Sequence, residues 1–320
     1  MPIVLKPGTL FISNEDVIRL STMEEYISVI ERAYGDRGEN KIVNFQRQTM
    51  EVPSGEKGKR TVHLLAAAAP NDNALGAYVY TGGFRGGDRG WQKCLILFDF
   101  TRGDLKAIVE SEHVSWLKTG AVSAVAAKYL SRKDARTVGI FGAGRQAVTQ
   151  LEGLCAVRQI KTIKVYSRTE EIRQTFSNMM EEKLGVEVRP ALSPREAVVG
   201  SDIVVTATTS KAPVFDGKWL EEGTHVTAIG AHYPHARELD EFAVRGHKIV
   251  VDTMDSAKEC GEFCLSGLDE KDIYAELGDI VAGKIGGRLS PGEITVFKSG
   301  GRGFEYVALG DHVYAKAIKA

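Results

Sequence analysis

Residues 137–147 read TVGIFGAGRQA, an apolar run followed at once by a glycine-rich turn. Val138–Phe141 is a short apolar segment typical of a buried strand, and the stretch from Gln146 onward has helical spacing. A strand, a glycine-rich turn and a helix within a unit of about 30 residues predict a dinucleotide-binding βαβ element. The alternative is a glycine-rich turn that joins a strand to a helix and binds no ligand.

Each residue of this turn has an expected role. Gly142 permits the tight turn, and Gly144 lets backbone amides approach a pyrophosphate. Ala147 stands where small size allows close packing of helix on strand, and Arg145 and Gln146 open the helix. The helix dipole adds to the attraction for the anion. We therefore expect a nicotinamide dinucleotide at this turn.

The end of the next expected strand indicates which dinucleotide binds. Sites that prefer NAD usually carry an acid there for the ribose 2′-hydroxyl, but this chain has Ser167, Arg168 and Thr169. A guanidinium suits bidentate, charge-assisted contact with a phosphate. NADP(H) is therefore favoured over NAD(H). The alternative is a solvated arginine that pairs with Glu170 or Glu171.

Strands and helices alternate from Thr137 onward, which is typical of a parallel sheet covered on both faces. Before that point, short β-rich runs between Phe45 and Val109 predict an antiparallel or mixed sheet. A last helix, Phe304–Ile318, could fold back on this first part. The predicted fold class is α/β. It combines a Rossmann-type doubly wound parallel sheet at 121–299 with a discontinuous α+β domain at 1–120 and 300–320, which is expected to bind substrate.

Composition and charge narrow the class of protein. The chain of 320 residues is 43% hydrophobic and 26% charged, with a formal net charge of −1, so we expect no attraction to nucleic acid or to an anionic membrane. No apolar run approaches the roughly 20 residues of a membrane helix. The four cysteines are scattered, and Cys260 and Cys264 have no Cys/His cluster beside them. We expect a cytoplasmic protein without a metal.

Polar and small residues at the expected strand ends are candidates for binding, because ligands of open α/β sheets gather beyond the carboxyl ends of the strands. The expected cofactor contacts at the strand ends are Thr206, Ala207, Thr208, Ile229, Gly230 and Ala231. Thr119, which precedes the first strand of this sheet, and Lys298, near the end of the chain, are expected to contact the cofactor as well. His232 follows Ala231 directly as a candidate for proton transfer. Arg47, Tyr78 and Lys118 stand out in the first part of the chain, and Gly301 is a further expected substrate contact.

The sequence resembles the ornithine cyclodeaminase/mu-crystallin family nearly end to end. The resemblance is carried by residues 117–154, 221–240 and 278–301. Members of this family include NAD(P)-dependent amino-acid dehydrogenases, imine reductases and cyclodeaminases, and some of its crystallins also bind small ligands. The resemblance implies a Rossmann domain and a discontinuous domain that makes a homodimer.

Three of the four polar positions that the family uses toward its substrate differ in this chain. The carboxylate-binding Arg of the family corresponds to Lys118, its substrate-facing Lys to Tyr78, and the acid of its Gly-Ala-Asp to His232, whereas Arg47 matches. Cyclodeamination relies on that Asp, Lys and Arg, so the resemblance argues against ornithine cyclodeamination here. His and Tyr can still both donate or accept a proton.

These residues predict an NADP-dependent oxidoreductase that acts on CH–NH or C=N groups, of the imine reductase or amino-acid dehydrogenase type. His232 or Tyr78 would give the proton, with Lys118 as a further catalytic candidate. Arg47 and Lys118 would hold the carboxylate of a small amino, imino or keto acid. Two alternatives stay open: a crystallin-like protein that binds cofactor and ligand with little catalysis, and ornithine cyclodeaminase. His232 could also be a structural residue, and Tyr78 a buried ring with a bonded hydroxyl.

Overall fold

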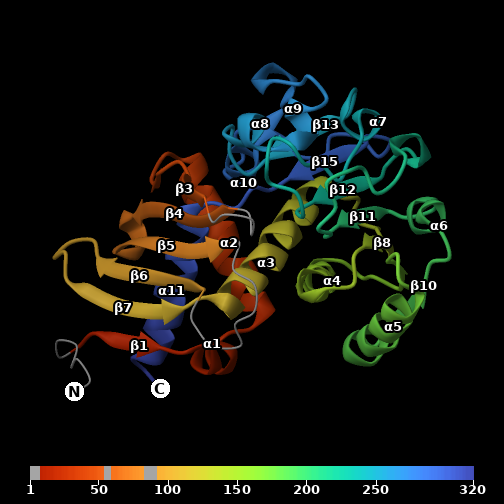
Figure 1. The fold of residues 1–320 in the computed structure, drawn as a ribbon. Coiled ribbons are helices and arrows are strands. Elements are labelled where there is room, and N and C mark those ends of the chain that lie inside the picture. Colours follow the sequence, from red (N-terminus) through yellow and green to blue (C-terminus); the bar gives the residue numbers. More distant parts are fainter. Residues whose placement is uncertain (1–7, 54–58, 83–91) are drawn as a thin grey trace. The chain divides into compact units, whose positions relative to one another are not determined.

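The computed structural model describes residues 8–53, 59–82 and 92–320. They form two compact units, which we call unit 1 and unit 2 (Figure 1). Unit 1 comprises Met1–Lys118 and Gly301–Ala320, and unit 2 comprises Thr119–Gly300. The chain thus leaves unit 1 once and returns to it for its last helix. The assignment of substrate binding and dimerisation to the discontinuous unit remains a prediction.

Unit 2 is built on an eight-stranded parallel sheet with the spatial order β10-β9-β8-β11-β12-β15-β13-β14. Its strands are β8 (Thr137–Phe141), β9 (Thr162–Tyr166), β10 (Glu187–Pro190), β11 (Ile203–Thr206), β12 (His225–Ala228), β13 (Lys248–Val251), β14 (Ala275–Glu276) and β15 (Thr295–Lys298). The chain adds β9 and β10 on one side of β8, and β11 and β12 on the other. Between β8 and β11 therefore lies the topological switch point at which open α/β sheets bind ligands.

Helices and short turns connect these strands, as parallel pairing requires. They are α4 (Arg145–Val157), α5 (Glu170–Leu184), α6 (Pro194–Val198), η3 (Gly217–Trp219), α7 (Glu241–Val244), α8 (Ser256–Glu259), α9 (Gly261–Cys264), η4 (Glu270–Asp272) and α10 (Leu277–Val281). The longest, α5, ends at Gly185, whose φ of +65° is the left-handed conformation that commonly closes a helix.

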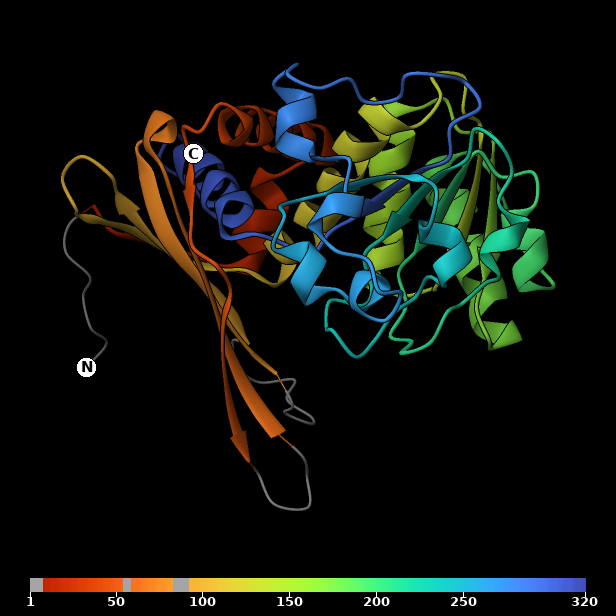
Figure 2. The ribbon, with the colours of Figure 1, turned by 90° about the horizontal axis from the view of Figure 1, so that it is seen from above.

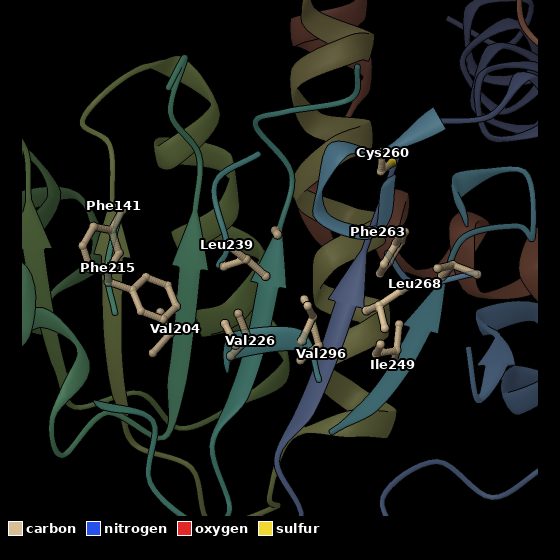
Figure 3. Close-up of a cluster of buried hydrophobic side chains, with 14 of the residues drawn as sticks. Phe141, Val204, Phe215, Val226, Leu239, Ile249, Cys260, Phe263, Leu268 and Val296 are labelled. Carbon is tan, nitrogen blue, oxygen red and sulfur yellow. The ribbon is translucent and has the colours of Figure 1, made fainter. Parts of the chain in front are cut away.

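One row of apolar side chains crosses this sheet and accounts for its continuous apolar strand sequences. Val204, Val226, Val296 and Ile249 are in register on β11, β12, β15 and β13, and each is at most 2% exposed. Figure 3 shows their side chains in the cluster that also contains Phe263. All four residues of β11 and of β12 are buried, as expected of strands covered on both faces, and the two polar ones of β12, His225 and Thr227, bond each other.

Unit 1 holds a seven-stranded mixed sheet of order β1-β7-β6-β5-β4-β2, with β3 also paired to β4. Its strands are β1 (Leu10–Ile12), β2 (Val43–Asn44), β3 (Gln48–Pro53), β4 (Lys59–Ala69), β5 (Ala74–Gly82), β6 (Lys93–Asp99) and β7 (Leu105–Glu110). The pair β1–β7 is parallel and the other pairs are antiparallel. Buried and half-buried residues alternate along β5, β6 and β7, which is typical of a sheet whose two faces have different surroundings.

Helices cover one face of the unit 1 sheet. Figure 2 shows α11 (Gly303–Ala317) and α2 (Met23–Gly38) on this face, and α11 packs against β4, β5 and β6. A Cβ atom at Gly303 would lie 2.7 Å from the carbonyl oxygen of Ala66, so only glycine lets the start of α11 approach β4 this closely. The remaining elements of this unit are α1 (Asn14–Leu20) and η2 (Pro70–Asp72).

The helix α3 (Glu112–Leu130) begins in unit 1 and ends in unit 2. Its residues 121–127 are all buried, which explains why this stretch lacks a polar stripe. No helix in the described ranges, α3 included, combines the length and the apolar character needed to span a bilayer.

The predicted fold class is confirmed, with one informative difference in strand length. Residues 202–210 predict one strand, but β11 ends at Thr206. The chain turns away there because the backbone N–H of Thr208 donates to the carboxylate of Glu238, 2.7 Å away, instead of to a neighbouring strand. A side chain distant in the sequence thus ends the strand, and local propensity cannot reveal this.

A buried histidine joins two strands at the opposite end of the unit 2 sheet. His225 on β12 is fully buried, with Nδ1 2.9 Å from Thr295 Oγ1 and Nε2 3.0 Å from Thr227 Oγ1. Thr295 Oγ1 donates to the carbonyl of Leu130, so His225 donates through Nδ1 and accepts at Nε2. Burial, helped by the charges of Arg288 and Arg158, lowers the pKa of His225 from 6.5 to about 3.

The free energy of unfolding should therefore fall when the pH drops below 6.5. Between pH 6.5 and about 3 the unfolded chain binds a proton at His225 and the folded chain does not, which lowers stability by up to about 1.4 kcal/mol per pH unit. The variant His225→Gln, which does not titrate, should lose this part of the slope in urea unfolding at a series of pH values. His235→Gln, at an exposed position, is the control. Equal slopes for His225→Gln and wild type would contradict the assignment.

Candidate functional site

A cavity of about 720 Å³ opens at the switch point of unit 2. It is lined by the turn after β8, the end of β9 and the loop after β11, through Phe141–Gly144, Tyr166–Arg168, Pro194, Ala207–Lys211, Pro213 and Val214. Its volume lies within the range of about 300–1,000 Å³ usual for ligand and cofactor pockets. The sequence-predicted residues Gly142, Gly144, Ser167, Arg168, Ala207 and Thr208 are thus brought together around one cavity.

The glycine turn fits a dinucleotide on two geometric grounds. Gly142 has a φ of +110°, and a Cβ atom there would lie 2.5 Å from the carbonyl oxygen of Ala207, so this position needs glycine. Gly144 has an ordinary extended conformation, and a Cβ atom there would meet nothing within 4 Å. The space beside Gly144 is therefore left open by the protein, as close approach of a pyrophosphate requires.

The first turn of α4 supplies the expected anion-binding amides. Its N-cap is Gly144, and no side chain caps the helix, which runs from Arg145 for 13 residues. Arg145 is exposed, Gln146 is half-buried, and Ala147 is fully buried against the sheet as predicted from its small size. The Oε1 atom of Gln146 is buried and accepts no hydrogen bond from the part of the chain that the structure describes. A hydroxyl of a bound ligand could satisfy it.

The second strand ends as the sequence predicts. Ser167 is half-buried, and Arg168 and Thr169 are exposed at the start of α5. Within the described ranges Arg168 forms no ion pair with Glu170 or Glu171, so the alternative of a surface pair is not what the structure shows. Arg168 is one of the residues that line the cavity, and none of the lining residues is an acid.

A carboxylate that the sequence did not point to joins the ends of β11 and β12 and the loops that follow them. Glu238 is fully buried and accepts four hydrogen bonds: from Thr206 Oγ1 at 2.9 Å, and from Thr208 N, Thr208 Oγ1 and Gly230 N at 2.7 Å each. A Cβ atom at Gly230 would lie 2.5 Å from Glu238 Oε1. Three predicted cofactor residues therefore meet at one side chain.

Lys298 on β15, another predicted cofactor contact, is engaged inside the protein. It is fully buried, its Nζ lies 3.3 Å from Glu262 Oε2, and it donates to the carbonyl of Ala231. Burial by itself lowers the pKa of Lys298, but the charges of Glu262, Cys260 and Glu238 outweigh it and raise the pKa. Lys298 thus stays charged and fixes the backbone at Ala231, next to Ile229 and Gly230.

His232 follows β12 and is half-buried. Its ring lies 4.3 Å from that of Tyr233, which in turn stacks on His235 at 5.7 Å. Thr119, the last of the predicted cofactor contacts, is a half-buried residue of α3 at the start of unit 2. Their roles toward a ligand stay predictions.

The predicted substrate residues of unit 1 converge around one glycine. Gly301 has a φ of +79°, and its carbonyl accepts a hydrogen bond from Arg47 Nη2 at 3.1 Å. A Cβ atom at Gly301 would lie 3.1 Å from Lys118 Nζ and 3.8 Å from Arg47 Nη2. Arg47 also donates to the hydroxyl of Tyr80 at 3.4 Å. The planar guanidinium of Arg47, which can donate two parallel hydrogen bonds, and the compact ammonium charge of Lys118 are therefore held near each other.

Lys118 is buried in an ion pair that sequence reasoning did not predict. Its Nζ lies 2.8 Å from Glu305 Oε2, and both side chains are at most 3% exposed. Glu305 also accepts from the Tyr34 hydroxyl at 2.6 Å and from Arg302 N at 3.0 Å. Losing either charge would leave the other buried and unbalanced, which typically costs about 3–5 kcal/mol. Glu305 thus holds Lys118 in place.

Tyr78 is 2% exposed and stacks on Tyr306, with ring centroids 3.7 Å apart and an interplanar angle of 7°. Lys118 Nζ lies 4.9 Å from the centroid of the Tyr306 ring. Burial, reinforced by Tyr306, raises the pKa of Tyr78 well above its ordinary 10.0, and a hydrogen bond with Ser115 opposes this only partly. Tyr78 therefore keeps its proton at neutral pH.

The residues missed from the sequence are acids and aromatics of the two networks: Glu238, Glu262, Glu305, Tyr80 and Tyr306. One signal was available. Glu305 is an isolated acid in the apolar stretch from Phe304 to Leu309, and a buried acid requires a partner. The identity of that partner depends on the tertiary structure. In the described ranges no group of three or more His, Cys, Asp and Glu side chains is arranged to hold a metal ion.

Comparison with known proteins gives consistent matches along the chain. A model of the ornithine cyclodeaminase/mu-crystallin family matches residues 8–320. The Delta(1)-pyrroline-2-carboxylate reductase of Bacillus cereus is 34% identical over 285 residues, covering 87% of this chain and 84% of the relative. The alanine dehydrogenase of Archaeoglobus fulgidus is 32% identical over 314 residues, covering 97% of this chain and 95% of the relative.

A solved structure shares the fold over nearly the whole chain. The Delta(1)-pyrroline-2-carboxylate reductase of Thermococcus litoralis, in complex with NADH and L-proline, has a TM-score of 0.89 at 35% identity, covering 97% of this chain and 98% of that one. These comparisons confirm the predicted class of enzyme, an NAD(P)-dependent oxidoreductase acting on C=N or CH–NH groups. The preference for NADP(H), the substrate and the roles of single residues stay predictions.

Proposed function

The chain belongs to the ornithine cyclodeaminase/mu-crystallin family, and on this basis we propose that it reduces the C=N bond of a small imino acid with NADPH, or oxidises the corresponding amino acid. The observation that carries the proposal is the cavity at the switch point, where Gly142, Gly144 and Arg168 meet. When bound there, a reduced nicotinamide supplies the hydride. Binding, orientation and proton transfer are the work of the chain's own residues.

Arg47 and Lys118 hold the substrate carboxylate. Both are cations, and the buried carboxylate beside them, Glu305, is already bonded to Lys118, Tyr34 and Arg302. An ammonium and a guanidinium both donate hydrogen bonds and accept none, so both side chains are of the type that binds a carboxylate. The Thermococcus relative was solved with L-proline, which supports a small imino or amino acid as substrate.

Tyr78 or His232 gives the proton to the substrate nitrogen. Tyr78 retains its proton because burial raises its pKa, so it is a donor at neutral pH and a weak base. His232 follows β12 and belongs to a residue type that titrates near neutrality, which suits reversible transfer. Cyclodeamination is a weaker alternative, because its expected Asp and Lys are His232 and Tyr78 in this chain.

Turnover on a defined set of compounds tests this proposal. We expect purified protein to consume NADPH with a cyclic imine carboxylate such as Delta(1)-pyrroline-2-carboxylate, or with a 2-keto acid plus ammonia. His232→Ala or Tyr78→Phe should lower kcat by about 100-fold or more if that residue is the donor. Tight NADPH binding without turnover on any compound would favour a binding protein, and ammonia release from ornithine would favour the cyclodeaminase. Unchanged kcat and KM in both variants would contradict the donor assignment.

The proposed preference for NADP(H) rests on Arg168. It is exposed at the cavity wall, and within the described ranges no carboxylate pairs with it. The strand end lacks the acid that would bond a ribose 2′-hydroxyl and repel a 2′-phosphate. Ser167 and Thr169 add hydroxyls at the same place.

Removing Arg168 should weaken NADPH binding selectively. A charge-assisted bond to phosphate contributes about 1.5–3 kcal/mol, so Arg168→Ala should raise the Kd for NADPH about tenfold or more. The Kd for NADH should change by less than about twofold. Arg189→Ala, at an exposed position outside the cavity, is the matched control. Equal losses for both dinucleotides, measured by the fluorescence of the reduced nicotinamide, would contradict the preference.

We also propose a homodimer built on the open face of the unit 1 sheet. Ala66, Ala77, Ile96 and Ile108 are in register across β4, β5, β6 and β7, and all four are half-buried in the single chain. They lie on the opposite face from Leu95 and Leu97, which Gly310 of α11 approaches. A contiguous apolar face of this kind marks an interface. A related archaeal alanine dehydrogenase was solved as a dimer.

A charge in the middle of this face should break the dimer. Ile96→Glu should halve the mass measured by light scattering, because a carboxylate buried in an apolar interface lacks a partner. Ile18→Glu, on the exposed side of α1, should leave the mass unchanged. A wild-type monomer, or a dimeric Ile96→Glu variant, would contradict the proposal.

A cytoplasmic location fits this function. Cys94, Cys155, Cys260 and Cys264 are all free thiols in the structure, as is usual in a reducing compartment. Small amino, imino and keto acids and nicotinamide dinucleotides are the partners that the proposal requires, and it requires no nucleic acid or membrane.

A further inference from the structure

We propose that Glu238 is a positioning residue that sets the nicotinamide half of the dinucleotide site by joining the loops after β11 and β12. This inference rests on the proposed function, because it presumes a dinucleotide in the unit 2 cavity. A dinucleotide-binding sheet consists of two mononucleotide-binding halves that meet at the switch point. Gly142–Ala147 and Arg168 belong to the half built on β8, β9 and β10, whereas the four hydrogen bonds of the Glu238 carboxylate all come from the ends of β11 and β12 and the loops that follow them.

The hydrogen bonds of Glu238 require an acceptor at both of its carboxylate oxygens. The N–H groups of Thr208 and Gly230 donate to different carboxylate oxygens, Oε1 and Oε2. A backbone N–H can only donate, so neither oxygen can be replaced by a donor without a donor–donor clash. The site therefore requires an acceptor at both positions, and a glutamine of the same size cannot reproduce this in either orientation, because its NH2 group is a donor only.

The backbone of Glu238 connects further parts of the same site. Its carbonyl accepts from Val214 N at 2.9 Å, and Val214 lines the cavity. Its own N–H donates to Glu262 Oε1 at 2.9 Å, and Glu262 pairs with Lys298. Lys298 in turn donates to the carbonyl of Ala231, which follows Gly230. The loops after β11 and β12 are thus tied to one buried charge network.

The position of Glu238 along the chain is itself fixed by packing. The next residue, Leu239, is fully buried and belongs to the apolar cluster on the sheet, where Figure 3 shows it near Val226. Because Leu239 is buried in this cluster, the segment that carries the Glu238 carboxylate is fixed against the sheet. Glu238 itself does not line the cavity, so its carboxylate acts through Thr208, which lines it, and through Gly230.

This role is tested by comparing the Kd for NADPH with the Kd for a ligand that contains only the adenosine half of NADPH. Glu238→Gln should raise the Kd for NADPH about tenfold or more, while the Kd for adenosine 2′,5′-bisphosphate, which has no nicotinamide half, changes by less than about twofold. Both are measured by calorimetry well below the melting temperature. A loss of general structure would weaken both ligands together, so parallel changes in the two Kd values would overturn the proposal, as would no change in either.

Asp202→Asn is the matched control. Asp202 also bridges backbone amides, from Arg136 at 2.7 Å and Thr137 at 2.9 Å, but at the opposite end of β8 and β11. It should lower the melting temperature and leave the ratio of the two Kd values unchanged. If the Glu238→Gln variant does not fold, the Thr206→Val variant tests the proposal in its place. It removes one of the four bonds and should change the ratio about threefold, and an unchanged ratio overturns the proposal.

The same measurements distinguish this inference from the proposed function. If the wild-type protein binds neither NADPH nor NADH, the proposed function fails. If the wild type binds NADPH and the ratio of Kd values is the same in wild type and Glu238→Gln, the function stands and Glu238 has no positioning role.

Discussion

The carbonyl oxygen of Ala207 lies so close to the backbone of Gly142 that a Cβ atom at Gly142 would come within 2.5 Å of it. This close approach sits where β8 and β11 stop pairing, since their register ends at Phe141 and Thr206. Beyond this point the segments that follow β8 and β11 both line the cavity. The direction of α4, the opening beside Gly144 and the place of Arg168 all depend on a residue without a side chain at this one position.

Buried charges hold the segments around this core. Glu238 with four donors, Lys298 with Glu262, and Lys118 with Glu305 are each almost completely removed from water. Such pairs contribute little to net stability, because desolvation offsets their attraction. Their effect is geometric: a misplaced partner leaves a charge unbalanced, so only one arrangement of the loops satisfies all of them. A binding site depends more on one fixed arrangement of its loops than on additional stability.

The polar positions that differ from the family pattern have partners suited to them. Tyr78, in place of a lysine, stacks on Tyr306, and Lys118, in place of an arginine, pairs with Glu305. Tyr306 lies under the ammonium of Lys118, so the two positions are physically coupled. The residues at these two positions therefore differ from the family pattern together, as parts of one contact network.

The sequence by itself determined the parallel sheet, the glycine turn, the likeness of Ser167–Thr169 to an NADP site, and the return of the last helix. Each of these is encoded locally, in periodicity or in the backbone freedom of glycine. Only the tertiary structure decided where β11 ends, what balances Lys118 and Lys298, and which carboxylate joins Thr208 to Gly230. The physical reason is sequence distance: Glu238 lies 30 residues from Thr208, and Glu305 lies 187 from Lys118, so no local pattern records these pairs.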